Sequence, residues 1–347
     1  MASCPTWVID LGAFAGRPRK RSRNNADTRL ERGLHSCCWV VVEVERLDTV
    51  VSVVIVSDFE DDAQKLWRTE RSLLEALARQ DFLEPCEVIL VESERYRDET
   101  PRDLAKICPR LRIVYSAETQ SAKLKDFGVS WATADLVAVF DADCLPNQSW
   151  LRVLVTVLRE RTDVSVVSGR THYGDETSYR RALSLVDRSF DNLGRPGLTP
   201  HISNNAALYR RSLLAQFPYP ETGTPFTSSI LRMQAMARAG VRFFFEPAAV
   251  VQHAIGGWDF VRDFRRHIGY ADMMMGDPAR RLRSIPPLLW WRFSFQGRDC
   301  LRLGPGYLRW YDWPLTAGLV AATPFLQVPG MLDAWRGRDA IPQTSFF

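Results

Sequence analysis

An apolar run that stops at two carboxylates constrains this chain more than any other feature. Residues 136–143 read LVAVFDAD, so a segment typical of a buried strand ends at Asp141 and Asp143. An isolated Asp-x-Asp is more often a capped turn, and its meaning depends on what precedes it. At the carboxyl end of a parallel strand, such carboxylates can hold a hard divalent cation against a diphosphate. The run therefore predicts an α/β fold with an acidic binding site at one edge of its sheet.

Segments typical of strands alternate with segments typical of helices on both sides of this run. The alternation predicts a mostly parallel, Rossmann-like sheet flanked by crossover helices. We expect strands at residues 50–56, 86–91, 111–115, 136–140, 164–168, 203–209, 241–246 and 250–253. We expect helices at residues 62–79, 101–107, 121–134, 148–161, 230–239 and 258–274. Gly240 is placed to cap the helix at 230–239.

Charge and cysteine content exclude several functional classes. With 45 basic and 41 acidic residues the net charge is only +4, so we expect no nucleic-acid partner. The seven cysteines include no Cys-x-x-Cys pair, which favours neither a disulfide framework nor a zinc site. The first apolar stretch, from Trp7 to Phe14, is short and carries Asp10, unlike a signal peptide. These features predict a cytoplasmic protein.

The chain divides into three regions by composition. Residues 1–47 carry a basic cluster with little periodicity, and we expect a disordered extension there. Residues 48–276 contain all the predicted strands and form the expected folded domain. Residues 277–347 are a basic and apolar C-terminal tail, predicted to be helical.

Part of this tail has the composition of a membrane segment. Residues 313–332 carry no charge over 20 residues, about the length that spans a bilayer. Trp310 and Trp335 bracket the segment like interfacial anchors. The prolines Pro314, Pro324 and Pro329 argue against one straight helix. Three arrangements stay open: a membrane span, a segment lying in the cytosolic membrane interface, and a buried C-terminal arm.

The residues that follow the strands are acidic rather than glycine-rich. The first strand continues into VSDFEDD at residues 56–62, without the glycines of a dinucleotide site, and the chain has no Walker A sequence. Glu92 follows the second strand, where a carboxylate can accept a hydrogen bond from a base or ribose. His253 ends a later strand and can offer a ring nitrogen to a metal. The pattern indicates a nucleotide site with a divalent cation.

The order of these segments resembles the family 2 glycosyltransferases of the GT-A fold over roughly residues 50–275. The segments that carry the resemblance are VSVVIVS at 51–57, VILVES at 88–93, SAKLKDFG at 121–128, VAVFDAD at 137–143, HISNNAALYRR at 201–211, VVQH at 250–253 and RDFRR at 262–266. The resemblance implies an enzyme that moves a sugar from a nucleoside-diphosphate-sugar donor, with UDP-sugars favoured, to a hydroxyl of a glycan or lipid acceptor. It also implies a bound Mg²⁺ or Mn²⁺.

The same resemblance assigns roles to individual residues. Asp141, Asp143 and His253 are the implied metal ligands, and Asp143 acts in catalysis through the metal that stabilises the departing diphosphate. The implied nucleotide-sugar-binding residues are Ser57, Glu92, Lys125, Asp141, Asn204, Asn205, Arg265 and Arg266.

The general base is the weak point of this assignment. Counting back from Gly240, the acidic pair of inverting members falls at Ser228 and Ser229, whose hydroxyls are poor bases at neutral pH. Glu221 is the nearest carboxylate, and we hypothesise that it deprotonates the acceptor.

Two other functions remain compatible with the sequence. One is a degenerate member that binds nucleotide sugars without turnover. The other is a nucleotidyltransferase, although the glycine-rich loop expected after its first strand is absent.

Overall fold

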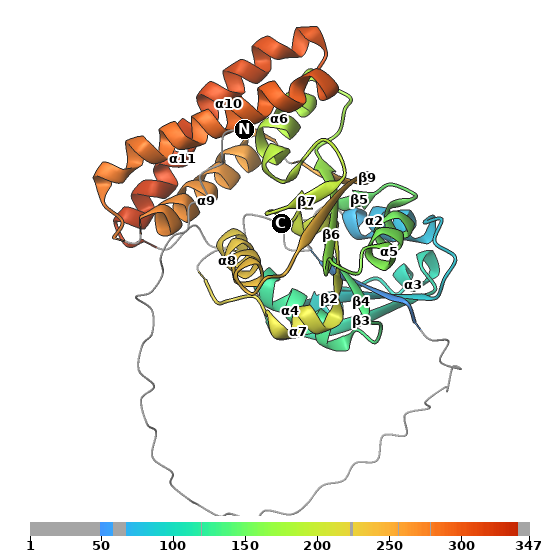
Figure 1. Cartoon of the computed structure of the whole chain (residues 1–347). Coiled ribbons are helices and arrows are strands. Elements are labelled where there is room, and N and C mark those ends of the chain that lie inside the picture. The colour runs from blue at the N-terminus through green and yellow to red at the C-terminus, as the bar shows by residue number, and fades with distance from the viewer. Residues whose placement is uncertain are drawn as a thin grey trace, which may run out of the picture. The chain divides into compact units, whose positions relative to one another are not determined.

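A β-sheet with helices on both faces forms the body of the computed structural model (Figure 1). The structure describes residues 49–57, 67–118, 120–222, 225–255, 257–277 and 279–338. The predicted extension at residues 1–47 and the first residues of the helix predicted at 62–79 lie outside these ranges. The described residues belong to one compact unit, Arg46–Phe347.

The sheet contains nine strands, and the helices include five short 3₁₀ segments. The strands are β1 Val51–Val56, β2 Cys86–Ser93, β3 Leu111–Ser116, β4 Leu136–Asp141, β5 Cys144–Pro146, β6 Val166–His172, β7 Gly197–Thr199, β8 Ala207–Arg210 and β9 Phe243–His253. The α-helices are α2 Arg68–Ala78, α3 Leu104–Ile107, α4 Ser121–Trp131, α5 Trp150–Glu160, α6 Ser178–Arg188, α7 Arg211–Gln216, α8 Pro225–Arg238, α9 Trp258–Gly276, α10 Ile285–Tyr307 and α11 Trp313–Trp335. The 3₁₀ segments are η1 Glu94–Tyr96, η2 Ser189–Asp191, η3 Asn204–Ala206, η4 Leu282–Ser284 and η5 Trp310–Asp312.

The strand order is β3-β2-β1-β4-β8-β6-β9-β5, and β7 pairs with β9. The first four strands in this order are parallel, as the sequence predicts, whereas β8 runs antiparallel to β4 and to β6. Val56 pairs with both Val91 and Asp141. Because parallel strands in register end at the same edge, Ser57, Glu92 and Asp141 come together at the carboxyl edge of the sheet.

Two hydrophobic layers attach helices to the two faces of the sheet. Val51, Val53 and Ile55 of β1 face the layer that packs on α2, α3 and α5. Val54 and Val56, one residue out of phase, face the layer that packs on α4, α7 and α8. This period of two, with apolar residues on both faces, is what a central parallel strand requires.

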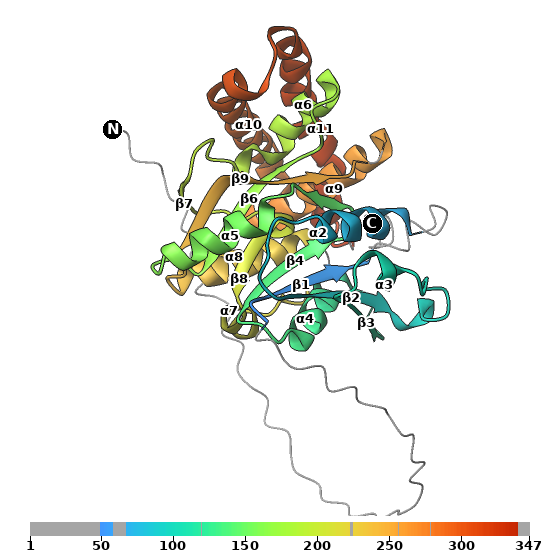
Figure 2. The same ribbon diagram turned by 90° about the vertical axis from the view of Figure 1, so that its right-hand side faces the viewer.

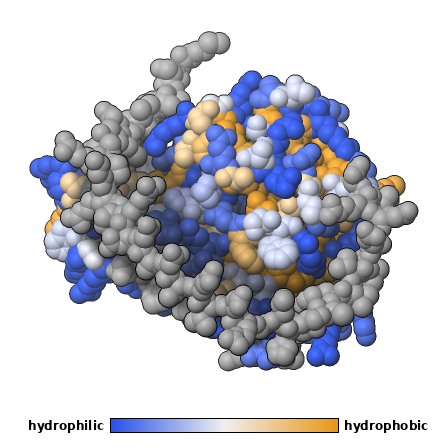
Figure 3. Space-filling model, turned by 90° about the horizontal axis from the view of Figure 1, so that it is seen from below, coloured by the Kyte–Doolittle hydropathy of each residue, from blue (hydrophilic) through white to orange (hydrophobic). Residues whose placement is uncertain are grey.

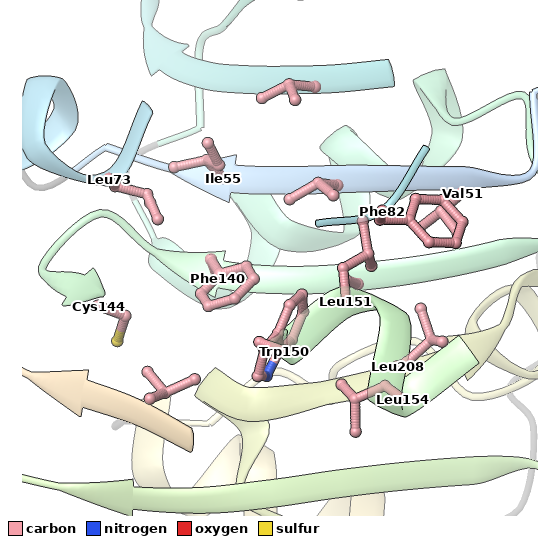
Figure 4. Close-up of a cluster of buried hydrophobic side chains, with 14 of the residues drawn as sticks. Val51, Ile55, Leu73, Phe82, Phe140, Cys144, Trp150, Leu151, Leu154 and Leu208 are labelled. Carbon is pink, nitrogen blue, oxygen red and sulfur yellow. The ribbon is translucent and has the colours of Figure 1, made fainter. Parts of the chain in front are cut away.

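The first of these layers contains Trp150, the largest of the fully buried side chains (Figure 4). The rings of Phe140 on β4 and Trp150 on α5 lie 4.6 Å apart between centroids. Cys144 belongs to the same layer, at the end nearest the carboxylates. Burial of each large apolar side chain contributes roughly 1.5–3 kcal/mol, so this layer holds the end of β4 firmly in place.

A separate group of helices, α6, α9, α10 and α11, packs together beside the sheet (Figures 1 and 2). The buried residues of this group include Val186, Val261, Cys300 and Leu319, one from each helix. The domain boundary between residues 276 and 277 stays a prediction. α9 precedes this boundary in the chain, whereas α10 and α11, against which α9 packs, follow it.

Several elements differ from the sequence expectations. The strand expected at 203–209 begins as η3 and becomes β8 only at Ala207, and the strands expected at 241–246 and 250–253 are one strand, β9. β9 pairs with β6 before and after a register shift between Ser168 and Arg170 of β6. This shift explains why the apolar pattern of β9 is interrupted. The helix capped by Gly240 is confirmed, with Gly240 at a φ of +80°.

Some elements were not predicted at all, and the C-terminal segment differs from its expectation. β5, β7, α6 and α7 have no counterpart among the predicted elements, whereas α10 and α11 form the helical C-terminal tail that the sequence predicts. α11 is a single helix although Pro324 and Pro329 lie inside it. Each interior proline removes one backbone hydrogen bond, and we attribute the continuity of α11 to its packing along α9 and α6.

Candidate functional site

A cavity of about 170 Å³ opens beside the carboxyl edge of the sheet. Residues from α4, β4, η2, η3, α8, β9 and α9 line it, so the sheet and the separate helix group both contribute. The residues that line the cavity are Ser121, Lys125, Asp141, Arg188, Phe190, Asp191, Ile202, Ser203, Asn204, Asn205, Ser229, Ile230, Met233, His253, Phe260, Phe264 and His267.

Three potential metal ligands meet where β5 pairs with the end of β9. A carboxylate oxygen of Asp143, the sulfur of Cys144 and a ring nitrogen of His253 lie within 4.8 Å of one another. Cys144 pairs directly with His253 in the β5–β9 ladder, and the Ala254 N–H donates to the Asp143 carbonyl at 2.8 Å. The backbone therefore fixes these side chains together, and Asp143 and His253 come from positions more than 100 residues apart.

The chemistry of this group fits a hard cation. His253 Nδ1 lies 2.6 Å from the Ala254 carbonyl oxygen and 3.3 Å from Asp143 Oδ2. With Nδ1 donating to these oxygens, Nε2 carries the lone pair that a metal needs. Burial raises the pKa of the Cys144 thiol well above its usual range, so Cys144 stays protonated and donates to Asp143 Oδ1 at 3.4 Å. Carboxylate and imidazole without thiolate suit Mg²⁺ or Mn²⁺ better than zinc.

Asp141 lies on the cavity side of this group and has a partner of its own. Lys125 Nζ is 2.6 Å from Asp141 Oδ1, and both side chains are largely buried. Burial lowers the pKa of Lys125, but the charge and hydrogen bond of Asp141 together with Tyr219 and Cys144 outweigh burial, and the pKa is raised. The pKa of Asp143 is raised by burial and by the nearby Asp141 carboxylate, against the opposing effect of His253. The two aspartates therefore repel each other, which favours a bound cation between them.

The residues predicted to contact the nucleotide lie at the same sheet edge. Glu92 is buried at the end of β2, where its Oε1 accepts the Ser93 N–H at 2.6 Å. The Ser57 hydroxyl donates to Glu70 Oε1 of α2 at 2.8 Å. Asn204 and Asn205 line the cavity, and the Tyr209 hydroxyl donates to Asn204 Oδ1 at 3.2 Å.

The predicted residues that do not line this cavity are Ser57, Glu92, Asp143, Arg265, Arg266 and Glu221, and the last three have partners away from it. Arg265 is buried against Asp187 of α6, and Arg266 pairs with Asp333 of α11 at 2.6 Å. Both arginines thereby connect α9 to neighbouring helices. The side chain of Glu221 is 82% exposed and lies 3.3 Å from Lys123.

The cavity also contains functional candidates that sequence reasoning missed. Arg188 and Asp191 come from the end of α6 and from η2, in a stretch to which no predicted element was assigned. Burial raises the pKa of Asp191 to about 7 and lowers that of His267 to about 4. In the sequence these residues stand in ordinary amphipathic stretches, and only the tertiary contacts bring them to the cavity.

Comparison with known families and structures agrees with this arrangement. Residues 52–217 match the model of the glycosyl transferase family 2. This segment is a family 2 glycosyltransferase domain. The comparison with curated proteins found no match to this chain.

The fold of this chain is similar to that of solved structures. The mannosyltransferase PcManGT of Pyrobaculum calidifontis, in complex with GDP-Man and Mn²⁺, is 18% identical over 82% of this chain and 86% of its own, with a TM-score of 0.52. Residues 1–349 of S. aureus TarS are 14% identical over 84% of this chain and 92% of their own, with a TM-score of 0.43. The likeness to PcManGT confirms the predicted GT-A fold class.

Proposed function

We propose that this protein is a metal-dependent glycosyltransferase that moves a sugar from a nucleoside-diphosphate-sugar donor to an acceptor hydroxyl. Asp141, Asp143 and His253 lie close together beside the cavity, and the two aspartates belong to the segment that matches the family 2 model; this is the observation that carries the proposal. Mg²⁺ or Mn²⁺ bound there would neutralise the charge that develops on the departing diphosphate. Glu92 and Ser57 would contact the nucleotide at the neighbouring strand ends.

The nucleotide base is the part of the donor that the site residues define least. Glu92 accepts hydrogen bonds and suits a donor group on a base or ribose, which both uracil and guanine nucleotides offer. The GDP-Man complex of PcManGT makes GDP-mannose the second donor to test beside the UDP-sugars.

A thermal-shift screen of UDP-, GDP- and dTDP-sugars, with and without Mn²⁺, tests the donor and metal together. A ligand at one hundred times its Kd stabilises the native state by about 2.7 kcal/mol, which is readily measured as a higher thermal midpoint. We expect one donor class to raise the midpoint only when Mn²⁺ is present. Release of the nucleoside diphosphate then distinguishes an enzyme from a protein that only binds the donor.

Asp143→Asn tests the metal site directly, because the amide keeps the shape and removes the charge. We expect the Mn²⁺-dependent part of the thermal shift to disappear and turnover to fall by at least 100-fold. Asp135→Asn is the matched control, since its carboxylate precedes β4 at the opposite edge of the sheet and is 99% exposed. Equal metal-dependent shifts in the Asp143→Asn variant and the wild type would contradict the assignment.

We also propose that the surface of α10 and α11 lies on the cytosolic face of an anionic membrane, where a lipid acceptor would be found. One helix of the described residues, Trp310–Trp335, has the length and hydropathy of a membrane span, and about half of its apolar window is buried in the protein. Its buried residues include the polar side chains Thr316, Thr323, Gln327 and Asp333. Because these polar side chains are buried against the protein, we infer that the helix stays packed on it and lies in the membrane interface, and that it does not span the bilayer.

The exposed residues of this surface have the composition of an interfacial site. The large apolar side chains exposed on α10, η5 and α11 are Trp290, Trp291, Phe293, Leu301, Trp310, Tyr311, Leu315, Phe325 and Trp335. Arg298, Arg309 and Arg336 lie among them, each over an aromatic ring. Aromatic rings at the headgroup level with arginines facing anionic lipids are typical of proteins that bind one leaflet. The opposite end of the molecule, seen from below in Figure 3, mixes hydrophilic and hydrophobic residues where it is not covered.

A further inference from the structure

The glycosyl transfer proposed above needs a group that takes the proton of the acceptor hydroxyl, and the cavity contains a carboxylate suited to this. Ser229 lines the cavity at the position where an acidic residue is expected, and its hydroxyl is a poor base. Glu221 is mostly exposed and pairs with Lys123. Besides Asp141, which Lys125 holds, the acidic side chain that lines the described cavity is Asp191.

Asp191 is held in place by its surroundings. It ends η2, directly after α6, and is almost completely buried. The next residue, Asn192, is fixed by α10, because its carbonyl accepts from Arg302 at 3.0 Å and its amide donates to the Tyr307 hydroxyl at 3.2 Å. Ser203, beside Asp191, is itself fixed by Thr171 at 2.6 Å. The carboxylate is therefore positioned before any ligand binds.

The charge state of Asp191 also suits proton transfer at neutral pH. Burial raises its pKa to about 7, although the Arg188 guanidinium and the Ser203 hydroxyl favour the charged form. Within the described part of the chain, neither carboxylate oxygen makes a hydrogen bond of good geometry. A buried carboxylate with free acceptor capacity and a pKa near the working pH is what general base catalysis requires.

We propose that Asp191 is the general base that deprotonates the acceptor in this glycosyltransferase, an inference that rests on the proposed function. The acceptor O–H proton passes to a carboxylate oxygen of Asp191, and the oxygen's electron pair forms the bond to the anomeric carbon. The bond between that carbon and the phosphate oxygen breaks, and the nucleoside diphosphate leaves with its electron pair. Attack opposite the leaving group inverts the anomeric configuration.

Hydrolysis of GDP-mannose and UDP-glucose with Mn²⁺ tests this role, because water replaces the unidentified acceptor and needs the same base. We expect Asp191→Asn to reduce release of GDP or UDP by about 10²–10⁴-fold. The donor-induced thermal shift with Mn²⁺ should remain, since Asp191 acts on the acceptor. Asp135→Asn, far from the cavity, should hydrolyse at the wild-type rate.

Stability separates a base from a structural residue. A raised pKa means that ionisation of Asp191 disfavours the native state, so this contribution to stability falls as pH rises from about 4 to about 7. Asp191→Asn should therefore unfold at the same or a higher temperature than the wild type at pH 8. A lower midpoint together with lost activity would assign Asp191 a structural role and overturn the proposal.

The pH profile and chemical rescue give two further readouts. Wild-type kcat/KM should fall below about pH 7, where Asp191 is protonated, and this limb should be absent in Asp191→Asn. The charged and titratable groups that interact with Asp191 are Arg188 on α6 and Tyr173 after β6, and the others that line the cavity are Lys125, Asp141, His253 and His267. Formate should restore turnover to Asp191→Ala, because it supplies the missing carboxylate.

The outcomes distinguish this inference from the proposed function. If the wild type releases no nucleoside diphosphate from any donor, the proposed function fails and the inference fails with it. If the wild type and Asp191→Asn turn over equally, only the inference is overturned. Loss of turnover in Glu221→Gln with full turnover in Asp191→Asn would give the role to Glu221 instead.

Discussion

At the scale of single residues, the pair formed by Lys125 and Asp141 shows how the fold prepares a ligand site. Both side chains are largely buried, and neither charge is stable in that position without the other. The pair holds the Asp141 carboxylate in place beside Asp143 before a ligand binds. The sequence predicts both residues near the nucleotide, and the structure places them in direct contact.

Replacing Lys125 tests this dependence. Lys125→Met should lower the free energy of unfolding by about 3–5 kcal/mol, because it leaves a buried carboxylate unpaired. The raised pKa of Lys125 means that its contribution is complete below its unfolded pKa and is lost only as pH rises through the folded pKa. Urea unfolding should therefore give the same difference from wild type at about pH 6 and about pH 9.

The double variant Lys125→Met/Asp141→Asn provides the control. It removes both charges, so it should recover part of the stability lost in Lys125→Met alone. If the double variant is less stable by the sum of the two single losses, the residues do not act as a pair.

At the scale of elements, the crossing of α9 and α11 depends on two glycines. A Cβ at Gly330 of α11 would overlap the Arg266 carbonyl oxygen, and one at Gly269 of α9 would overlap the Gln327 carbonyl oxygen. The two backbones thus approach each other without intervening side chains. This contact explains why a helix with interior prolines stays continuous and packed.

Gly330→Ala should force α9 and α11 apart. We expect a loss of about 1–3 kcal/mol in the free energy of unfolding, since the obstructing atoms belong to backbone that cannot move independently. Gly318→Ala in the same helix is the matched control, because nothing lies within 4 Å of its added Cβ. There the gain in helix propensity should stabilise the protein by up to about 1 kcal/mol. Equal effects of the two substitutions in urea denaturation would refute the close crossing.

At the scale of the whole molecule, the membrane surface proposed on α10 and α11 would give the protein a defined orientation. Trp310 of η5 is 83% exposed and Phe325 of α11 is 69% exposed, whereas the buried face of α11 packs on α9 and α6. Transfer of each such ring from water into the interface contributes roughly 1.5–3 kcal/mol if burial is complete.

Sedimentation with vesicles that contain phosphatidylglycerol measures this binding. The double variant Trp310→Ser/Phe325→Ser should bind about tenfold or more weakly than the wild type. Added salt should weaken binding further, because it screens the arginines. Leu83→Ser is the control, as Leu83 is 94% exposed on the loop after α2. Wild-type protein that stays in the supernatant would exclude the membrane surface.

The sequence by itself determined the parallel half of the sheet and the position of the acidic edge. Apolar runs such as residues 51–56 and 136–140 are buried on both faces, so their strand character depends only on local composition. The position of Asp141 and Asp143 follows from this strand, because residues at the end of a parallel strand lie at the carboxyl edge of the sheet. The family 2 resemblance, confirmed for residues 52–217, rests on the same local segments.

Only the tertiary structure decided which distant groups complete the site. Cys144 joins His253 through a short strand pair, and Asp191 reaches the cavity because α10 fixes the residue that follows it. Neither contact can be predicted from neighbouring residues in the sequence, since each joins segments about 110 residues apart. The strong pKa shift of Asp191 likewise comes from burial by several elements at once, which no window of sequence contains.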